Sequence, residues 1–310
     1  MSFQSMKTIF YLMFFLVICR QCYSYSNIVK VHVNISSYYK NNNGYKNTNE
    51  IVKEKIAELT DENDPNEVTR ITGGEYARER QFPFISVVHR LVGNGVIAQC
   101  GGSILSKRWV LTAGHCIAEA PRRFFLVFGI INKSGISYDK NVGPGISMIT
   151  TRAYPHPRYV EAINDIGLLY MPNDIPFTNS IQPISLAGYN DLYANYEHAT
   201  AIVIGWGKER ATGSTTQALK YARLSVITNR ECRLYWQIDE RNICTAFGAG
   251  QHACQGDSGG PLIVQTTNKR YIQIGIVSYG DSNCPSNKPG VFTRVAAFST
   301  WIKSITGIRY

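Results

Sequence analysis

The stretch HACQGDSGGPL, residues 252 to 262, contains the residues best suited to chemistry in this sequence. It places Ser258 beside an aspartate and among three glycines. Glycines gather where the backbone must turn sharply or lie close to another group. The pattern G-D-S-G-G fits the G-x-S-x-G motif that presents a nucleophilic serine in hydrolases. A polar turn between two strands would use the same residue types, so the remaining sequence must distinguish the two interpretations.

A serine nucleophile requires a general base and an acid that orients this base, because a hydroxyl group is a poor nucleophile at its free pKa. All six histidines precede Ser258, whereas in an α/β-hydrolase the histidine follows the serine. The candidates are His115, in WVLTAGHC (109 to 116), and Asp165, in NDIGLL (164 to 169). A lone histidine is more often structural, and an aspartate before a strand is usually a turn former. The order His, Asp, Ser on a β-rich fold is what favours catalysis.

The N-terminus has the features of a secretory signal peptide. Lys7 precedes the apolar run IFYLMFFLVIC (9 to 19), and small residues follow around Ser24 and Ser26. The run is too short to span a bilayer, which needs about 20 apolar residues. We therefore expect a signal peptide over residues 1–24, a secreted, extracellular protein and no membrane anchor.

Cysteine usage agrees with an oxidising compartment. Two of the eight cysteines lie in the expected signal peptide, and no C-x-x-C pair follows it, so disulfides are favoured over a zinc site and no metal is expected. Six cysteines allow fifteen pairings, among which the spacing does not choose. The six are Cys100, Cys116, Cys232, Cys244, Cys254 and Cys284.

The formal charge of +10 does not indicate a nucleic-acid-binding protein. Nucleic-acid binding requires basic residues clustered on one element with aromatic residues, and here the lysines and arginines are scattered. The sequence therefore predicts a basic solvated surface that favours acidic partners.

The amino-acid composition and the hydrophobic pattern of the chain change near residue 70. Residues 25–70 include KNNNGYKNTNE (40 to 50) and a short charged stretch, and little there could build a core, so we interpret them as a removable pro-segment. From Ile71 onward, short β-branched runs alternate with Gly, Pro and Asn, which is typical of an all-β sandwich or barrel. The last segment, VAAFSTWIKSITG, has apolar residues at helical spacing and predicts one closing helix.

From Ile71 to nearly the C-terminus, the sequence resembles the trypsin and chymotrypsin family of serine proteases. The resemblance implies an all-β fold of two six-stranded antiparallel β-barrels, with the active site between them and a protease domain over residues 71–310. The matching motifs are ITGG (71 to 74), LTAGHC (111 to 116), NDIGLL (164 to 169), GWG (205 to 207), CQGDSGGPL (254 to 262), VSYG (277 to 280) and KPGVFTRV (288 to 295).

The resemblance assigns a role to each candidate residue. His115 would accept the proton of Ser258 and return it to the leaving amine, while Asp165 would hold the imidazole in the required tautomer. The backbone amides of Gly256 and Ser258 would form the oxyanion hole. No cofactor is implied.

The resemblance also implies activation by cleavage. The bond after Arg70 would be cut by a separate trypsin-like protease, and the new amine of Ile71 would pair with Asp257 to order the oxyanion loop. The implied disulfides join Cys100 to Cys116, Cys232 to Cys244, and Cys254 to Cys284, which leaves none to hold the pro-segment.

The primary specificity pocket is where this sequence departs from trypsin itself. His252 stands at the expected floor, where trypsin-like members have aspartate, and Gly280 and Gly290 are the expected small walls. Ser278 and Tyr279 would also contact the substrate. A neutral His252 suits large apolar or aromatic side chains, whereas a protonated one would admit an acidic side chain, and a third interpretation gives His252 only a packing role. We expect chymotrypsin-like specificity.

Two classes of function stay open at this point. The first is an active, monomeric endopeptidase that acts on polypeptide substrates and is controlled by serpins or other protease inhibitors. The second is a catalytically silent homologue that binds partners; because all three triad residues are present, activity is favoured. Two N-x-[ST] sites occur, at Asn34 in the pro-segment and at Asn132 in a polar loop, and Asn132 is the expected mature glycosylation site.

Overall fold

The computed structural model describes residues 74–192, 194, 196–210, 212–248, 251–284 and 286–309. All of them belong to one compact unit, Pro65–Tyr310. The expected signal peptide (1–24), the pro-segment (25–70) with Asn34 and Arg70, and the predicted new N-terminus Ile71 lie outside the described residues. No helix among the described residues is long and apolar enough to cross a membrane.

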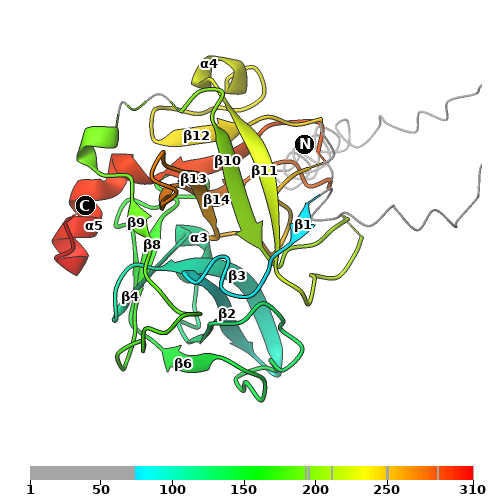
Figure 1. The fold of residues 1–310 in the computed structure, drawn as a ribbon, viewed down its shortest axis with the longest axis vertical. Helices are drawn as coiled ribbons and strands as arrows, with labels where there is room; N and C mark the ends of the chain where they lie inside the picture. Colours follow the sequence, from blue (N-terminus) through cyan, green and yellow to red (C-terminus); the bar gives the residue numbers. More distant parts are fainter. Residues whose placement is uncertain are drawn as a thin grey trace, which may run out of the picture. The chain divides into compact units, whose positions relative to one another are not determined.

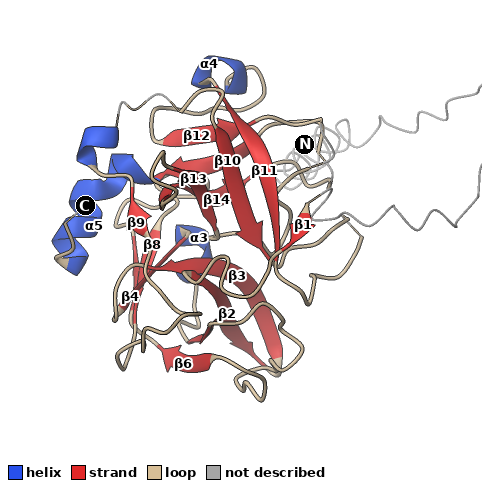
Figure 2. Ribbon diagram, viewed as in Figure 1, coloured by secondary structure: helices blue, strands red, loops and turns tan. Residues whose placement is uncertain are grey.

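The described chain is built from two sheets, one formed by its first half and one mainly by its second half, to which the short N-terminal strand β1 is added (Figures 1 and 2). The strand order of the first sheet is β6-β5-β2-β3-β4-β8-β7, and all pairs are antiparallel. Its strands are β2 (Ile85–Gly93), β3 (Val96–Ile104), β4 (Trp109–Thr112), β5 (Phe124–Phe128), β6 (Ile146–Thr150), β7 (Ala153–Pro155) and β8 (Gly167–Tyr170).

The first sheet curls, and no ladder joins its two edge strands β6 and β7. These strands are instead consecutive in the chain, separated by Thr151 and Arg152. At the bend, the Tyr170 amide donates to the Arg152 carbonyl at 2.9 Å, and the Thr150 hydroxyl donates to the Tyr170 carbonyl at 2.6 Å. The predicted first barrel is therefore a curled half-barrel, with six strands if β6 and β7 count as one bent strand.

The second sheet closes into the predicted six-stranded barrel. Its order is β1-β11-β10-β13-β14-β15-β12, and an additional β11–β12 pairing completes the ring. The short β1 extends the sheet beside β11, and β9 adds the one parallel pairing of this sheet, to β14. The strands are β1 (Glu75–Tyr76), β9 (Ser185–Leu186), β10 (Thr200–Gly205), β11 (Lys220–Ile227), β12 (Asn242–Thr245), β13 (Pro261–Gln265), β14 (Tyr271–Tyr279) and β15 (Gly290–Arg294).

Apolar side chains fill the interior of both sheets. All five residues of β5, Phe124–Phe128, are buried, including three phenylalanines, which explains its continuous apolar sequence. In β11, exposed and buried residues alternate over part of the strand, as expected where one face meets solvent. Burial of this kind makes both sheets firm supports for the loops at their ends.

The predicted closing helix is confirmed. A 3₁₀ turn, Val295–Phe298, leads into helix α5 (Ser299–Thr306), which ends at Gly307 in the left-handed conformation (φ 74°). Val295, Phe298 and Ile302 are buried. The other described helices are α3 (Gly114–Ile117), the 3₁₀ turn Tyr189–Asp191 and α4 (Asn229–Cys232).

The three implied disulfides are all present. They join Cys100 to Cys116, Cys232 to Cys244, and Cys254 to Cys284, with Cα separations of 6.2, 6.3 and 6.0 Å. Such separations lie within the normal range for disulfides. The first bridge connects β3 to α3. The third bridge connects Cys254, which lies just before Ser258, to Cys284, which lies shortly after the end of β14.

Candidate active site

The predicted catalytic residues lie in three loops at the ends of strands. His115 is in α3, directly after β4, and Asp165 lies two residues before β8. Since β4 and β8 pair with Thr112 opposite Gly167, the two loops leave the sheet side by side. Ser258 precedes β13 in the second sheet.

Asp165 holds His115 through two hydrogen bonds. Its Oδ1 accepts the backbone amide of His115 at 2.9 Å, and its Oδ2 lies 2.8 Å from His115 Nδ1. The hydroxyl of Ser278, on β14, donates to the same Oδ2 at 2.5 Å. Because a carboxylate only accepts, Nδ1 of His115 carries the proton and Nε2 is left with its lone pair.

These donors stabilise the negative charge of the Asp165 carboxylate although the carboxylate is buried. The carboxylate is 3% exposed, and burial alone would raise its pKa. The hydrogen bonds and charge of His115, with the hydroxyl of Ser278, outweigh burial and hold the pKa of Asp165 below its ordinary value. The group is therefore ionised at neutral pH.

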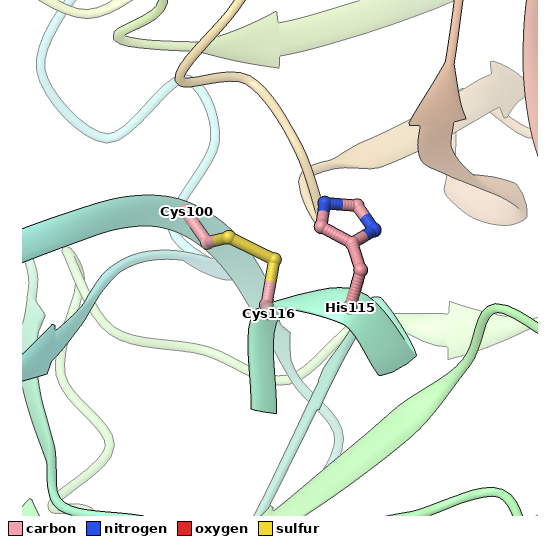
Figure 3. Close-up of side chains that lie close together, drawn as sticks. All are labelled: Cys100, His115 and Cys116. Atoms are coloured by element: carbon pink, nitrogen blue, oxygen red, sulfur yellow. A yellow bond between two sulfur atoms is a disulfide. The ribbon is translucent and has the colours of Figure 1, made fainter. Parts of the chain in front are cut away.

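Figure 3 shows His115 projecting from α3 beside the disulfide of Cys100 and Cys116. Potential metal-ligand atoms of these three residues lie within 4.8 Å of one another. Both sulfur atoms belong to the disulfide and offer no thiolate, which is the form that binds metal. This cluster therefore anchors the helix that carries His115 and has no metal-binding donor set.

Ser258 and His115 open onto the same cleft, which has a volume of about 810 Å³. Ser278 and Tyr279 also line it. The Ser258 carbonyl accepts the amide of Gly101 at 2.8 Å, which fixes the serine against β3 of the first sheet. Among the described residues, neither Gly256 nor Ser258 donates its amide to another group, so both amides are available to a ligand.

The glycines around Ser258 are required by backbone conformation and by close contacts. Gly256 and Gly259 have φ values of 96° and 76°, in the left-handed region that favours glycine. A Cβ on Gly259 would also collide with the Thr112 hydroxyl and approach the Gly101 carbonyl to 2.7 Å. Close packing of this loop against the first sheet is therefore the physical reason for the glycine cluster.

Asp257 points away from the cleft into a recess formed by the GWG segment. Its carboxylate is 2% exposed and accepts the amides of Gly207 at 2.7 Å and Cys254 at 3.0 Å. A Cβ on either Gly205 or Gly207 would collide with its oxygens. Burial raises the pKa of Asp257 to about 6, only partly offset by the two amides and by the charge of Lys133. None of the ion pairs among the described residues includes Asp257.

A second cavity, of about 250 Å³, adjoins Ser258 and is lined by His252, Gly280 and Gly290. These are the residues predicted for the specificity pocket. His252 is buried, and both ring nitrogens face carbonyl oxygens, Nδ1 that of Ala253 at 2.5 Å and Nε2 that of Lys288 at 3.2 Å. The ring therefore combines two of the expected roles, since it packs against the main chain and also lines the cavity.

Two features of the site have no motif in the sequence: an acid that lines this cavity, and a buried polar cluster behind the oxyanion loop. Asp281 lines the same cavity as His252, and its Oδ1 accepts the Asn283 amide at 3.4 Å. The cluster includes Gln99 and Lys133, which lie outside the motifs that carry the family resemblance, and no local pattern assigns them to the site. Asn132, the predicted glycosylation site, is exposed, and its Oδ1 accepts the Ser134 amide at 2.8 Å.

The family described as Trypsin matches residues 71–302, which is most of the chain. The chain belongs to the trypsin family. It is 36% identical over 206 residues to a chymotrypsin of Phaedon cochleariae, covering 66% of this chain and 71% of the relative. It is 31% identical over 261 residues to the clotting factor G beta subunit of Tachypleus tridentatus, covering 77% and 80%.

A solved structure of HL collagenase is similar in fold as well as in sequence. Its TM-score is 0.67 at 29% identity, and the match covers 76% of this chain and 99% of that chain. The trypsin-family fold of two packed β-barrels is thus confirmed for this chain, with its first barrel the curled half-barrel described above.

Replacing Ser278 with Ala should weaken the support of Asp165. Loss of one donor raises the pKa of Asp165 and should lower the free energy of unfolding by about 1–2 kcal/mol at pH 7. Because the folded-state pKa is depressed, this stabilisation exists above the unfolded pKa and is lost as pH falls. The difference between variant and parent, measured by urea unfolding, should therefore shrink from pH 5 to pH 2. Ser137→Ala, at an exposed hydroxyl, is the control, and a pH-independent difference would contradict this account.

Proposed function

We propose that this trypsin-family chain is an active serine endopeptidase, secreted as a zymogen, and not a silent homologue. The observation that carries the proposal is the hydrogen bond from His115 Nδ1 to Asp165, which turns Nε2 of His115 into a base on the cleft that Ser258 shares. A silent homologue has no need of this geometry together with two free amides beside the serine.

The first half of the reaction makes an acyl-enzyme. His115 Nε2 takes the proton of Ser258 as its Oγ attacks the carbonyl carbon of the scissile peptide bond. The carbonyl oxygen becomes an oxyanion that the amides of Gly256 and Ser258 bind, while Asp165 stabilises the imidazolium. The imidazolium then gives its proton to the leaving nitrogen, the carbon–nitrogen bond breaks, and the amine departs.

The second half releases the acid. Water enters the cleft, His115 takes one of its protons, and the hydroxide oxygen attacks the ester carbon. The oxyanion forms again at the same two amides, and His115 returns its proton to Ser258 Oγ as the ester bond breaks. The enzyme is then as it began, and one peptide bond has been exchanged for a carboxylate and an amine.

Asp257 supports activation by cleavage after Arg70. A buried carboxylate without a cation is costly, and its raised pKa reflects that cost. The new ammonium group of Ile71 would enter the recess, pair with Asp257 and make the ionised form stable at neutral pH. This pairing orders the loop that holds Gly256, so activity depends on the cut, which a separate trypsin-like protease makes.

The pocket beside Ser258 supports chymotrypsin-like specificity. Glycine walls leave room for a large side chain, and His252 places no carboxylate on its side of the cavity. Burying a guanidinium there would be costly without a paired charge. Asp281, which lines the same cavity, favours the competing preference for Arg or Lys and must be tested together with His252.

The remaining parts of the proposal follow from secretion. The mature enzyme is an extracellular monomer that cleaves polypeptides, carries a glycan at the exposed Asn132 and is controlled by serpins or other protease inhibitors.

Replacing Ser258 with Ala should abolish amide hydrolysis, lowering kcat by 10⁴-fold or more, because the nucleophile is lost while the amides remain. His115→Ala should cause a similar loss. Hydrolysis of a chromogenic peptide amide after trypsin treatment measures this, and reaction of Ser258 with an organophosphate gives an independent readout. A parent enzyme that neither cleaves nor reacts would support the silent homologue.

Replacing Arg70 with Gln should leave a folded, inactive precursor. In this precursor Asp257 keeps a raised pKa, so its contribution to stability is present at acidic pH and is lost as pH rises through about 6. In the cleaved parent, the Ile71 ammonium lowers this pKa, so the difference in unfolding free energy between cleaved parent and variant should grow from pH 5 to pH 7.5. Arg309→Gln, at an exposed arginine near the C-terminal end of the described residues, should be cleaved and activated normally. Full activity of the uncut chain would contradict zymogen activation.

Replacing His252 with Asp should shift cleavage towards Arg and Lys by at least tenfold in relative kcat/KM, because the cavity then gains a buried carboxylate. Profiling a peptide library with the activated parent should show cleavage after large apolar residues. Asp281→Asn is the matched variant and should leave the profile unchanged. A parent that already cleaves after Arg and loses this preference in Asp281→Asn would reassign specificity to Asp281.

A further inference from the structure

A buried polar cluster lies behind the oxyanion loop, outside the residues that the reaction uses. Its members are His89 on β2, Gln99 on β3, Lys133 after β5 and Thr215 before β11. Lys133 is 6% exposed, which is unusual for a lysine, since its ammonium loses most of its hydration. The contacts around the Lys133 ammonium must therefore compensate for this loss of hydration.

Gln99 connects the first sheet to the oxyanion loop. Its side-chain Nε2 donates to the Gly256 carbonyl at 3.3 Å and to the Trp206 carbonyl at 3.3 Å. Its Oε1 accepts a short hydrogen bond from the Lys133 ammonium. The same ammonium donates to the Thr215 hydroxyl at 3.3 Å, and the Thr215 methyl packs against Gly256.

Lys133 determines which way round the Gln99 amide lies. A carboxamide has a donor end and an acceptor end, and the two ends have nearly the same shape. An ammonium can only donate, so Oε1 must face Lys133. Nε2 must then face the two carbonyls, which can only accept. Without the cation, the amide could rotate and present oxygen to oxygen.

His89 lies directly opposite Gln99 in the β2–β3 ladder, and neither of its ring nitrogens makes a hydrogen bond of normal geometry among the described residues. Burial, and then the charge of Lys133, lower the pKa of His89 to about 4, so the ring is neutral at physiological pH. Its contact with the Gln99 side chain raises the pKa of His89 but is outweighed by these two effects. At neutral pH the cation of the cluster is therefore Lys133, although burial lowers the pKa of its ammonium group to about 8.

The contact with Gln99 bears on the oxyanion hole because of where it holds the backbone. The peptide after Gly256 is held at both polar groups: its carbonyl by Gln99, and its N–H, that of Asp257, by the Cys254 carbonyl at 3.0 Å. Gly256 has a φ of 96° and no side chain to restrict it. The Gly256 N–H belongs to the preceding peptide, whose Gln255 carbonyl accepts the Lys208 amide at 2.8 Å. With the peptides on both sides of Gly256 held, its amide is confined to the position from which it can donate to an oxyanion.

We infer that Gln99, oriented by Lys133, is a positioning residue that holds the Gly256 amide in the oxyanion hole. The inference rests on the proposed protease function. It assigns to the first sheet a part in stabilising the transition state that is additional to presenting His115 and Asp165.

The test compares variants of the activated enzyme. Gln99→Leu alone would leave the buried Lys133 without its main partner and could prevent folding. The double variant Gln99→Leu, Lys133→Met removes the amide and the charge together and fills the space with apolar atoms. It should lower kcat by about tenfold or more with KM changed less than twofold, because the lost support acts in the transition state.

A peptide aldehyde separates this role from general damage. The aldehyde forms a tetrahedral adduct with Ser258 whose oxyanion occupies the hole, so its inhibition constant should rise by the same factor by which kcat falls. Gln99→Glu keeps an acceptor for Lys133 but has no N–H for Gly256, and should lose at least as much as the double variant. Lys107→Met, at an exposed lysine, is the control and should change neither constant.

The two proposals fail in different ways. A parent that is inert to substrate and to organophosphate would overturn the protease function itself. An active parent whose kcat and aldehyde affinity are unchanged in both Gln99 variants would overturn the role of Gln99 alone. Equal rises of KM and of the aldehyde constant, with kcat unchanged, would also overturn it, since that pattern shows a loss of ordinary substrate binding.

Discussion

The buried carboxylate of Asp165 is the contact on which the arrangement of the site depends. It joins the two sheets, because His115 reaches it from the first sheet and Ser278 donates to it from β14. The Thr293 hydroxyl on β15 also donates to the backbone carbonyl of Asp165 at 2.7 Å. An ionised group so deeply buried is stable only with several donors. Any relative movement of the sheets would therefore remove hydrogen bonds from a charge that water cannot reach.

The loop of Ser258 differs from Asp165, whose acceptors are all satisfied, because this loop must be held firmly while two of its amides stay free. It has few side chains of its own, so its position comes from neighbours: Gly101 binds the Ser258 carbonyl, the GWG segment surrounds Asp257, and Gln99 binds the Gly256 carbonyl. Most of these partners act through backbone groups. Glycines allow this close approach, and the same freedom makes the loop dependent on external contacts.

Charge distribution around this loop links activation to catalysis. Asp257 and Lys133 are both buried and influence each other, and burial disfavours the charged form of each, raising the pKa of the aspartate to about 6 and lowering that of the lysine to about 8. In our proposals, the amine of Ile71 relieves Asp257, while Gln99 and Thr215 accept from Lys133. Two buried charges on either side of one glycine peptide would then set the geometry of the oxyanion hole.

The sequence by itself determined the family, the fold class, the closing helix and the cysteine pairs, because long motifs in a fixed order admit few alternatives, and these were confirmed. It also named the residues that meet at the cleft, through local signals such as G-D-S-G-G and LTAGHC. Tertiary structure alone decided that β6 and β7 are the two edges of a curled half-barrel, that the nitrogens of His252 face carbonyls and that Asp281 shares its cavity. The cluster of Gln99 and Lys133 likewise appears only when distant segments pack together. Side-chain direction and the pairing of buried polar groups depend on contacts between segments far apart in the chain, and no local pattern encodes them.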